Sequence, residues 1–375
     1  MATLRDLIRV LDDAFPFSRA EKSDKVGLQI GDANAPVSRV LVAHEVTSET
    51  IEEAHGCDVL FVYHPLIFRA LENLDFANHT ARLAARCIAQ SLNVVAVHTA
   101  LDNAPFGHAL GDELAKSLGL DNVRVLKESG RESLFKIVVF VPDEALEKVS
   151  LALWQAGAGR IGDYERASFR ARGIGTFRPL LGANPYDGEI GRDAAADEWR
   201  LEVVVRAAQR DRAVAAMLAA HPYEEVAYDV YALHNSLEAF GAARFGELQS
   251  STRIHDFVEF VTSKLHSPNV RVVTSGKAEI RSVACVPGAG ASYIESAARA
   301  GCDCLVTGDI KHHDALMATA HGLALIDVTH VATERAAIDL IADTLNAPSV
   351  KAQSGVEVRR SALDTNPFSA SKVSL

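Results

Sequence analysis

Apolar and polar positions follow a repeating strand and helix pattern at each end of the chain. The short apolar runs rich in β-branched residues are 39–43, 58–63, 93–97, 282–286, 304–308 and 323–328. The segments of helical periodicity between them are 48–55, 79–91, 290–300 and 311–321. This alternation predicts a largely parallel sheet with helices on both faces.

The middle of the chain, about 134–235, has a different order. Strand, helix and a strand-like stretch rich in Gly and Pro are followed by strand, helix and strand, the split β-α-β pattern of a ferredoxin-like domain. Linkers of charged or small residues at 127–133 and 234–242 bracket it. We therefore predict a discontinuous, two-lobed α/β core with an inserted ferredoxin-like α+β domain. The predicted parts are a first core half (1–129), the insert (130–238), a second core half (239–347) and a C-terminal tail (348–375).

Composition restricts the class of protein. A chain of 375 residues with 48% hydrophobic and 23% charged residues has enough apolar surface for a packed core in more than one domain. The net charge of −11 and the lack of a Lys/Arg run disfavour nucleic-acid binding. The amphipathic start lacks the features of a signal peptide, and no apolar run reaches the roughly 18–20 residues that span a bilayer. The five cysteines are irregularly spaced, so we expect a reduced, cytoplasmic protein in which Cys302 and Cys304 are buried hydrophobic residues.

Titratable residues follow the carboxyl ends of the predicted strands, where doubly wound sheets bind ligands. They are His64, His98, Asp102, Asp309, His312, His313, His330 and Glu334. If a helix begins near His330, the i, i+4 spacing places His330 and Glu334 on one helix face, as in metal-binding helices. Imidazoles and carboxylates without a thiolate favour Zn²⁺, Fe²⁺ or Mn²⁺ over Ca²⁺ or a structural zinc site.

Several of these residues have a competing structural explanation. A single His at a strand end is more often a hydrogen-bonded structural residue than a ligand. We expect His312 and His313 to open a helix that Asp309 caps, a role that competes with catalysis. The segment 221–225 either lines a ligand cleft of the insert or forms a turn before a strand with alternating Tyr and Val.

Seven motifs occur along the chain in the order found in one known family. They are HPLIF (64–68), HTALDNA (98–104), AGAGRIGDYERASF (156–169), GIGTFRP (173–179), HPYEEVAYDVY (221–231), TGDIKHHDA (307–315) and THVATE (329–334). With VGLQIGD (26–32), they resemble the Nif-three-like family, also called GTP cyclohydrolase 1 type 2 homologues, over about residues 5–345. The match is to the longer, three-part branch of that family.

This resemblance has implications for fold, assembly and site. It implies an α/β core interrupted by a PII/CutA-like insert, six subunits in a homohexameric ring, and a dinuclear metal centre facing an internal cavity. It also implies metal ligands from three family motifs, His-His-Pro, His-x-x-x-Asp and Gly-His-x-x-x-Glu. By position these ligands are His64, Asp102, His330 and Glu334, with His98 nearby as a further ligand.

The chain departs from the family at two site positions. Tyr63 replaces the first His of His-His-Pro, and a neutral phenol is a poor metal ligand. Thr329 replaces the Gly before the late His, which restricts φ, although Thr is also a good N-cap. His44 follows the run 39–43 and either supplies the missing nitrogen or, by strand alternation, points to the other face of the sheet. We therefore expect one tightly held divalent metal per chain and a second site that is empty or weak.

Two main hypotheses on function follow. The first is a metal-dependent hydrolase that acts on a nucleotide or related heterocycle through a metal-bound hydroxide, as the family name suggests for GTP. The second is a non-enzymatic metal-handling or regulatory protein whose PII-like insert binds a small-molecule effector. A scaffold for protein partners is supported only by the implied ring. The name alone does not determine a substrate, because fold and family do not fix function.

Overall fold

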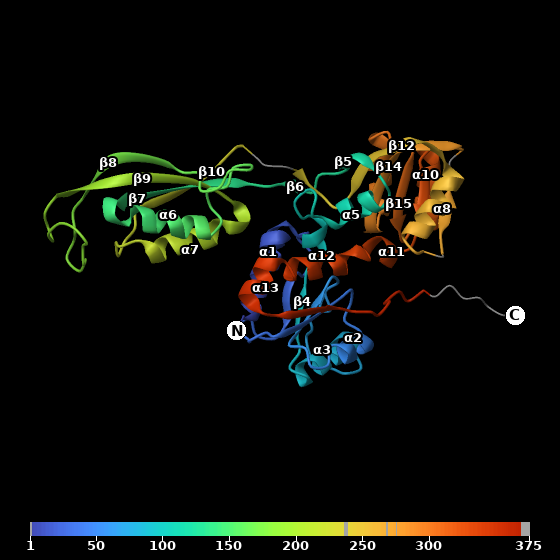
Figure 1. The fold of residues 1–375 in the computed structure, drawn as a ribbon, viewed down its shortest axis with the longest axis horizontal. Coiled ribbons are helices and arrows are strands. Elements are labelled where there is room, and N and C mark those ends of the chain that lie inside the picture. Colours follow the sequence, from blue (N-terminus) through green and yellow to red (C-terminus); the bar gives the residue numbers. More distant parts are fainter. Residues whose placement is uncertain (1, 236–238, 268, 275, 369–375) are drawn as a thin grey trace. The chain divides into compact units, whose positions relative to one another are not determined.

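The computed structural model shows a chain divided into two compact units (Figure 1). The described residues are 2–235, 239–267, 269–274 and 276–368. One unit consists of Met1–Gly130 and Ala239–Leu375, and the other of Arg131–Glu238. The first is discontinuous in sequence, so the predicted fold class, an α/β core with an inserted α+β domain, is confirmed. Among the described residues, no helix is long and apolar enough to cross a membrane.

The first sheet of the core unit has five strands in the order β1-β4-β3-β2-β17. The strands are β1 (Gly27–Ile30), β2 (Arg39–Ala43), β3 (Val59–Val62), β4 (Asn93–Ala96) and β17 (Glu357–Arg360). Strands β17, β2, β3 and β4 are parallel, and β1 joins β4 antiparallel at the edge. Every residue of β3 and β4 is buried, as expected for central strands covered on both faces.

Helices cover both faces of this sheet. They are α1 (Leu4–Ala14), α2 (Ser48–Glu53), α3 (His79–Ala89) and α12 (Ala336–Leu345). Val40 and Val42 of β2 pack with α1 and α12, whereas Leu41 and Ala43 pack with α2 and α3. This division follows from the two-residue period of a strand, which directs successive side chains to opposite faces.

The second sheet has six strands in the order β13-β16-β15-β14-β12-β5. The strands are β5 (Asp121–Val125), β12 (Arg244–Arg253), β13 (Arg271–Val273), β14 (Glu279–Ala289), β15 (Cys304–Gly308) and β16 (Ala324–Asp327). Only β14, β15 and β16 are parallel. The sheet is therefore mixed rather than largely parallel, because β5, β12 and β13 join it antiparallel.

Several helices pack on the second sheet. Among them are α5 (Leu110–Ser117), α8 (Ile254–Lys264), α9 (Ile294–Arg299) and α10 (His312–Ala320). Cys304 packs on the face covered by α5 and α8, and Cys302 belongs to the cluster under α9 and α10. Both thiols are buried and free, which confirms them as small hydrophobic residues.

The insert is a four-stranded antiparallel sheet with two helices. Its elements are β7 (Leu134–Pro142), α6 (Leu146–Gln155), β8 (Phe169–Phe177), β9 (Ala194–Arg206), α7 (Arg210–Ala220) and β10 (Tyr228–Ala232), and the strand order is β10-β7-β9-β8. Val139 of β7 and Val203 of β9 pack against Leu153 of α6 and Met217 of α7. The chain order of these elements is the ferredoxin-like order that the sequence predicts.

The C-terminal segment, expected as a tail, completes the first sheet. Helix α13 (Pro348–Ser354) leads into β17, which pairs in parallel with β2. Beyond β17, the Ser361 backbone N–H donates to the Val42 carbonyl at 2.7 Å, and that of Ala362 donates to Glu53 Oε1 at 3.0 Å. The segment therefore follows β2 to the end of the strand that precedes His44.

Two short helices begin directly after central strands. Helix α4 (His98–Asp102) follows β4, and α11 (His330–Glu334) follows β16. The residue before α11, Thr329, has φ +75°, and its side chain makes no capping hydrogen bond. A β-branched residue rarely adopts positive φ, because its Cβ crowds the backbone. The turn that positions His330 is therefore strained, and Thr329 does not act as the hydrogen-bonding N-cap expected from its residue type.

We predict that Thr329→Gly stabilises the metal-free protein. Glycine adopts positive φ without strain. Because the relief of strain exceeds the extra conformational entropy that glycine loses on folding, the free energy of unfolding should rise by about 1 kcal/mol. Thermal unfolding should show a midpoint higher by a few degrees, as is common for a change of about this size. Thr319→Gly, inside α10, is the matched control and should lower the midpoint. A lower midpoint for Thr329→Gly would contradict the strain.

Candidate metal centre

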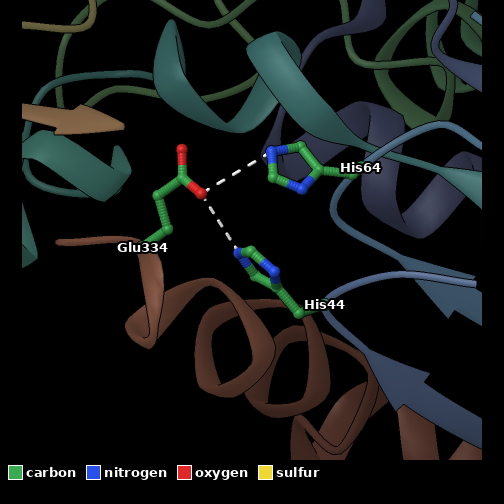
Figure 2. A group of neighbouring side chains, drawn as sticks. All are labelled: His44, His64 and Glu334. Carbon is green, nitrogen blue, oxygen red and sulfur yellow. Dashed lines mark hydrogen bonds and ion pairs between the residues drawn. The ribbon is translucent and has the colours of Figure 1, made fainter. Parts of the chain in front are cut away.

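Glu334 is the centre of a cluster of imidazole side chains. It lies at the end of α11 with only 3% of its surface exposed. Its Oε1 is 3.1 Å from His330 Nε2, and its Oε2 is 3.1 Å from His44 Nε2 and 3.6 Å from His64 Nε2. Figure 2 shows the carboxylate directed at one nitrogen of His44 and one of His64. Each carboxylate oxygen therefore faces at least one imidazole nitrogen.

His44 and His64 reach Glu334 from the ends of neighbouring strands. His44 follows β2, and His64 follows Tyr63 at the end of β3. His44, His64 and Glu334 each place one potential ligand atom within 4.8 Å of the others, so they form a group that can hold a metal ion. The chain bends at His44, directly after β2, and the ring is buried within the cluster. Of the two orientations that the sequence leaves open for His44, the structure shows the one that faces the site.

His64, His98 and His330 each have a carboxylate beside the Nδ1 nitrogen of the ring. The pairs are His64 Nδ1 with Glu45 at 3.3 Å, His98 Nδ1 with Asp24 at 2.8 Å, and His330 Nδ1 with Asp309 at 2.7 Å. Metal-ligating histidines commonly have this partner, because it fixes the ring orientation and makes the other nitrogen a better donor. In His64 and His330 the other nitrogen faces Glu334. This donor set fits a divalent cation bound by imidazole and carboxylate.

Tyr63 is buried beside the cluster and does not present a free ligand atom. It is 1% exposed, and its hydroxyl donates to Asp102 Oδ1 at 2.8 Å. Burial, together with the Asp102 and Glu334 carboxylates, raises the pKa of Tyr63 well above 10, so the phenol is neutral near pH 7. Burial and repulsion from Glu334 raise the pKa of Asp102 to about 7. The phenol therefore occupies one acceptor position of Asp102, which leaves that carboxylate less free to bind an ion.

A protonated His330 balances the buried charge of Glu334 when no ion is bound. Burial alone raises the pKa of Glu334, but hydrogen bonds with His330 and His44 outweigh it and lower this pKa to about 2. The hydrogen bond with Glu334 raises the pKa of His330 to about 9. Burial opposes protonation of His44, yet Glu334 and Glu45 raise its pKa overall. A buried carboxylate needs a positive partner, and a divalent cation supplies the same compensation as these protons.

Gly288 allows Glu334 and His330 to approach the second sheet closely. It has φ +63°, and a Cβ there would lie 2.4 Å from Glu334 Oε1 and 3.1 Å from His330 Nε2. Its backbone N–H donates to Thr333 Oγ1 at 2.7 Å, which ties β14 to α11. Sequence reasoning did not identify Gly288; the available signal is the VPGAG run (286–290) directly after a predicted strand.

The structure brings most of the predicted ligands together. His64, His330 and Glu334 are in direct contact, and the ring centroid of His98 is 5.2 Å from that of His64. Asp102 is buried beside Tyr63 and close enough to Glu334 for the two carboxylates to repel each other.

The structure differs from the sequence-based predictions for several other candidate residues. His312 and His313 do open α10, but both are exposed and neither belongs to the cluster. Asp309 was expected to cap α10 and does not: Lys311 is the N-cap residue, and Asp309, at φ +57°, contacts His330 instead. Sequence analysis did not assign the orienting roles of Asp24 and Glu45. Glu45 does follow the predicted strand 39–43, whereas nothing in the sequence context of Asp24 distinguishes it from a surface acid.

The cluster opens onto a cavity of about 980 Å³. His64 and His330 line it with 23% and 31% of their side-chain surfaces exposed, whereas Glu334 is almost fully covered. The remaining lining residues are Glu45, Asn269, Val270, Arg271, Asp309, Asp327, Thr329, Val331, Asn366, Pro367 and Phe368. The volume is typical of a site for a small molecule, and the C-terminal segment forms part of its wall.

Comparisons with known proteins agree with the fold and with the resemblance. The family model described as Duf34/NIF3 (NGG1p interacting factor 3) matches residues 2–367. Proteins named GTP cyclohydrolase 1 type 2 homolog from Halalkalibacterium halodurans and Bacillus subtilis are each 37% identical, over 98% and 97% of this chain and 99% and 97% of their own. The crystal structure of a Bacillus cereus protein related to NIF3 gives a TM-score of 0.81 at 36% identity, with 98% of each chain covered. On this sequence and structural evidence, the chain belongs to the Duf34/NIF3 family.

Proposed function

We propose that the chain is a metal-dependent hydrolase acting on a nucleotide or a related heterocycle. The observation that carries the proposal is the buried carboxylate of Glu334, surrounded by imidazoles, at one wall of a cavity large enough for a small molecule. When bound, a divalent ion there lowers the pKa of water and polarises the bond under attack. The names of the relatives, GTP cyclohydrolase 1 type 2 homolog, support a nucleotide as the first substrate to test.

Different residues have different roles in this proposed reaction. Glu334, His64, His330 and His44 hold the ion, and their carboxylate partners keep the rings oriented. Arg271 lines the cavity and donates to the Ile310 carbonyl at 2.8 Å and to Asp327, so its guanidinium is held at the wall with further N–H groups free for a phosphate oxygen. Phe368, 68% exposed in the same cavity wall, offers an aromatic face to a heterocyclic base.

A second candidate function is a metal-handling or regulatory protein without turnover. The observation that favours it is a further cavity, of about 550 Å³, within the insert. A regulator needs an effector site in addition to a metal site, and the insert offers one. Turnover distinguishes the two proposals, because a metal-handling protein exchanges its ion and transforms no substrate.

We predict about one tightly held divalent ion per chain in protein purified without a chelator. Tyr63 gives the second ion of a pair no free nitrogen, and it engages Asp102 through its hydroxyl. Elemental analysis should therefore show about one equivalent, rising towards two in Tyr63→His. Two equivalents in the unmutated chain would contradict the proposed role of Tyr63.

We predict that His44→Ala weakens retention of the single ion by about tenfold or more, the range typical of losing a residue at a metal site. Competition with a chromogenic chelator measures this affinity. His312→Ala is the matched control, because His312 is exposed on α10 outside the cluster, and it should leave the affinity unchanged. Equal affinities for His44→Ala and the unmutated chain would exclude His44 as a ligand.

We predict that metal-loaded protein releases formate from GTP or hydrolyses another member of a panel of nucleotides and cyclic amides. Arg271→Ala should raise KM about tenfold with little effect on kcat, because it removes ground-state binding of an anionic group. Arg281→Ala, an exposed arginine of β14 that pairs with Glu247, is the matched control. If no member of the panel turns over faster than with His64→Ala, the hydrolase proposal fails and the metal-handling proposal stands.

A further inference from the structure

The insert contains a cleft that the proposed chemistry at the metal centre does not use. It has a volume of about 550 Å³ and lies among the end of β8, the loop 178–193 and the segment 221–227. Two of the sequence motifs, GIGTFRP (173–179) and the first residues of HPYEEVAYDVY (221–231), form its walls. Its size is sufficient for a small organic molecule.

Aromatic rings form the apolar part of the cleft. Phe140, Phe177, Tyr186 and Tyr223 all line it. The ring centroids of Tyr186 and Tyr223 are 5.5 Å apart at an angle of 43°, so the two rings are tilted towards each other rather than stacked face to face. Phe177 and Tyr186 keep 37% and 49% of their surfaces exposed. The cleft therefore presents accessible aromatic surface to a ligand.

The charged groups in the cleft are predominantly acidic. Asp187, Glu198, Glu224 and Glu225 line it, and Arg178 is the one basic lining residue among those described. The Arg178 guanidinium donates to both oxygens of Asp193, at 2.7 and 2.6 Å, so its charge is already compensated. The lining therefore favours a positively charged ligand.

Glu198 lies close over a glycine of β8. A Cβ at Gly175 would lie 2.1 Å from Glu198 Oε2, so the absence of a side chain at Gly175 leaves room for the carboxylate in this position. Glu198 adjoins the Tyr223 phenol; burial, followed by Glu198 and then by Asp187 and Glu144, raises the pKa of Tyr223. Carboxylates from several segments therefore lie close to the Tyr223 phenol and make this part of the cleft negatively charged.

His221 fixes the wall that carries Tyr223 and adds no positive charge. Its Nε2 hydrogen-bonds with the Phe140 carbonyl at 3.0 Å, and its Nδ1 accepts from the Tyr223 backbone N–H at 3.1 Å. Burial lowers the pKa of His221, so the ring is neutral near pH 7. The histidine of this motif is therefore a positioning residue, and the acidic excess of the cleft is not offset by it.

We propose that this cleft binds a small organic cation with an apolar body, such as a quaternary ammonium or a protonated amine. Aromatic faces attract such a cation through their quadrupoles, and the carboxylates of Glu198 and its neighbours add a Coulombic attraction. A nucleotide or another anion is disfavoured here by the same carboxylates. The inference concerns the insert alone and does not depend on hydrolysis at the metal centre.

The test compares matched probes on the full chain by isothermal titration calorimetry. Benzyltrimethylammonium and choline should both bind, and 3,3-dimethylbutanol, which has the shape of choline without its charge, should bind at least about tenfold more weakly, since losing one charge pair and a cation–π contact has an effect of that order. Equal affinity for choline and 3,3-dimethylbutanol, or tighter binding of GTP at this cleft, would overturn the proposal.

Variants assign the binding to the cleft. Glu198→Gln should weaken choline binding about fivefold or more, and Glu225→Gln should weaken it in the same direction. Glu189→Gln is the control, because Glu189 lies on the same loop, pairs with Arg192 and does not line the cleft. Unfolding curves that match the unmutated chain show that the variants fold. Unchanged choline affinity in both Glu198→Gln and Glu225→Gln would contradict the assignment.

Discussion

The buried charge of Glu334 is the constraint on which the site depends. A carboxylate with 3% of its surface exposed is stable only if positive groups or hydrogen-bond donors surround it. His330 lies on α11 with Glu334, whereas His44 and His64 follow β2 and β3, two neighbouring strands of the first sheet. The cluster therefore forms only when segments from both ends of the sequence fold together, and Gly288 and the strained Thr329 turn serve this arrangement.

Tyr63 fills its position beside the cluster as a buried, neutral phenol. The Tyr63 hydroxyl donates a hydrogen bond to Asp102 and remains neutral. His44, which follows the adjacent strand β2, places a ring nitrogen next to Glu334. His44, His64 and Glu334 form a group that can hold one metal ion, and His330 contacts the other oxygen of the Glu334 carboxylate. This arrangement is the physical basis for proposing one strong site rather than two equal ones.

The sequence predicts the strands and helices that carry the cluster, because their hydrophobic periodicity is strong. The run 39–43 coincides with β2, and the i, i+4 spacing of His330 and Glu334 does lie on one short helix. It does not predict the direction of His44, since a bend directly after β2 overrides strand alternation. Nor does it predict that Asp24 and Asp309 orient histidines, because these contacts join segments 74 and 21 residues apart and have no local signal.

The proposed function includes His44 among the residues that hold a divalent ion beside Glu334. Anomalous diffraction from a crystal of the metal-loaded protein, recorded at the absorption edge of the bound metal, tests it most directly. The account predicts one strong peak at about 2.1 Å from His44 Nε2, with His64 and Glu334 as further ligands. A strong peak between Asp102 and His64 that leaves His44 outside bonding distance would contradict it.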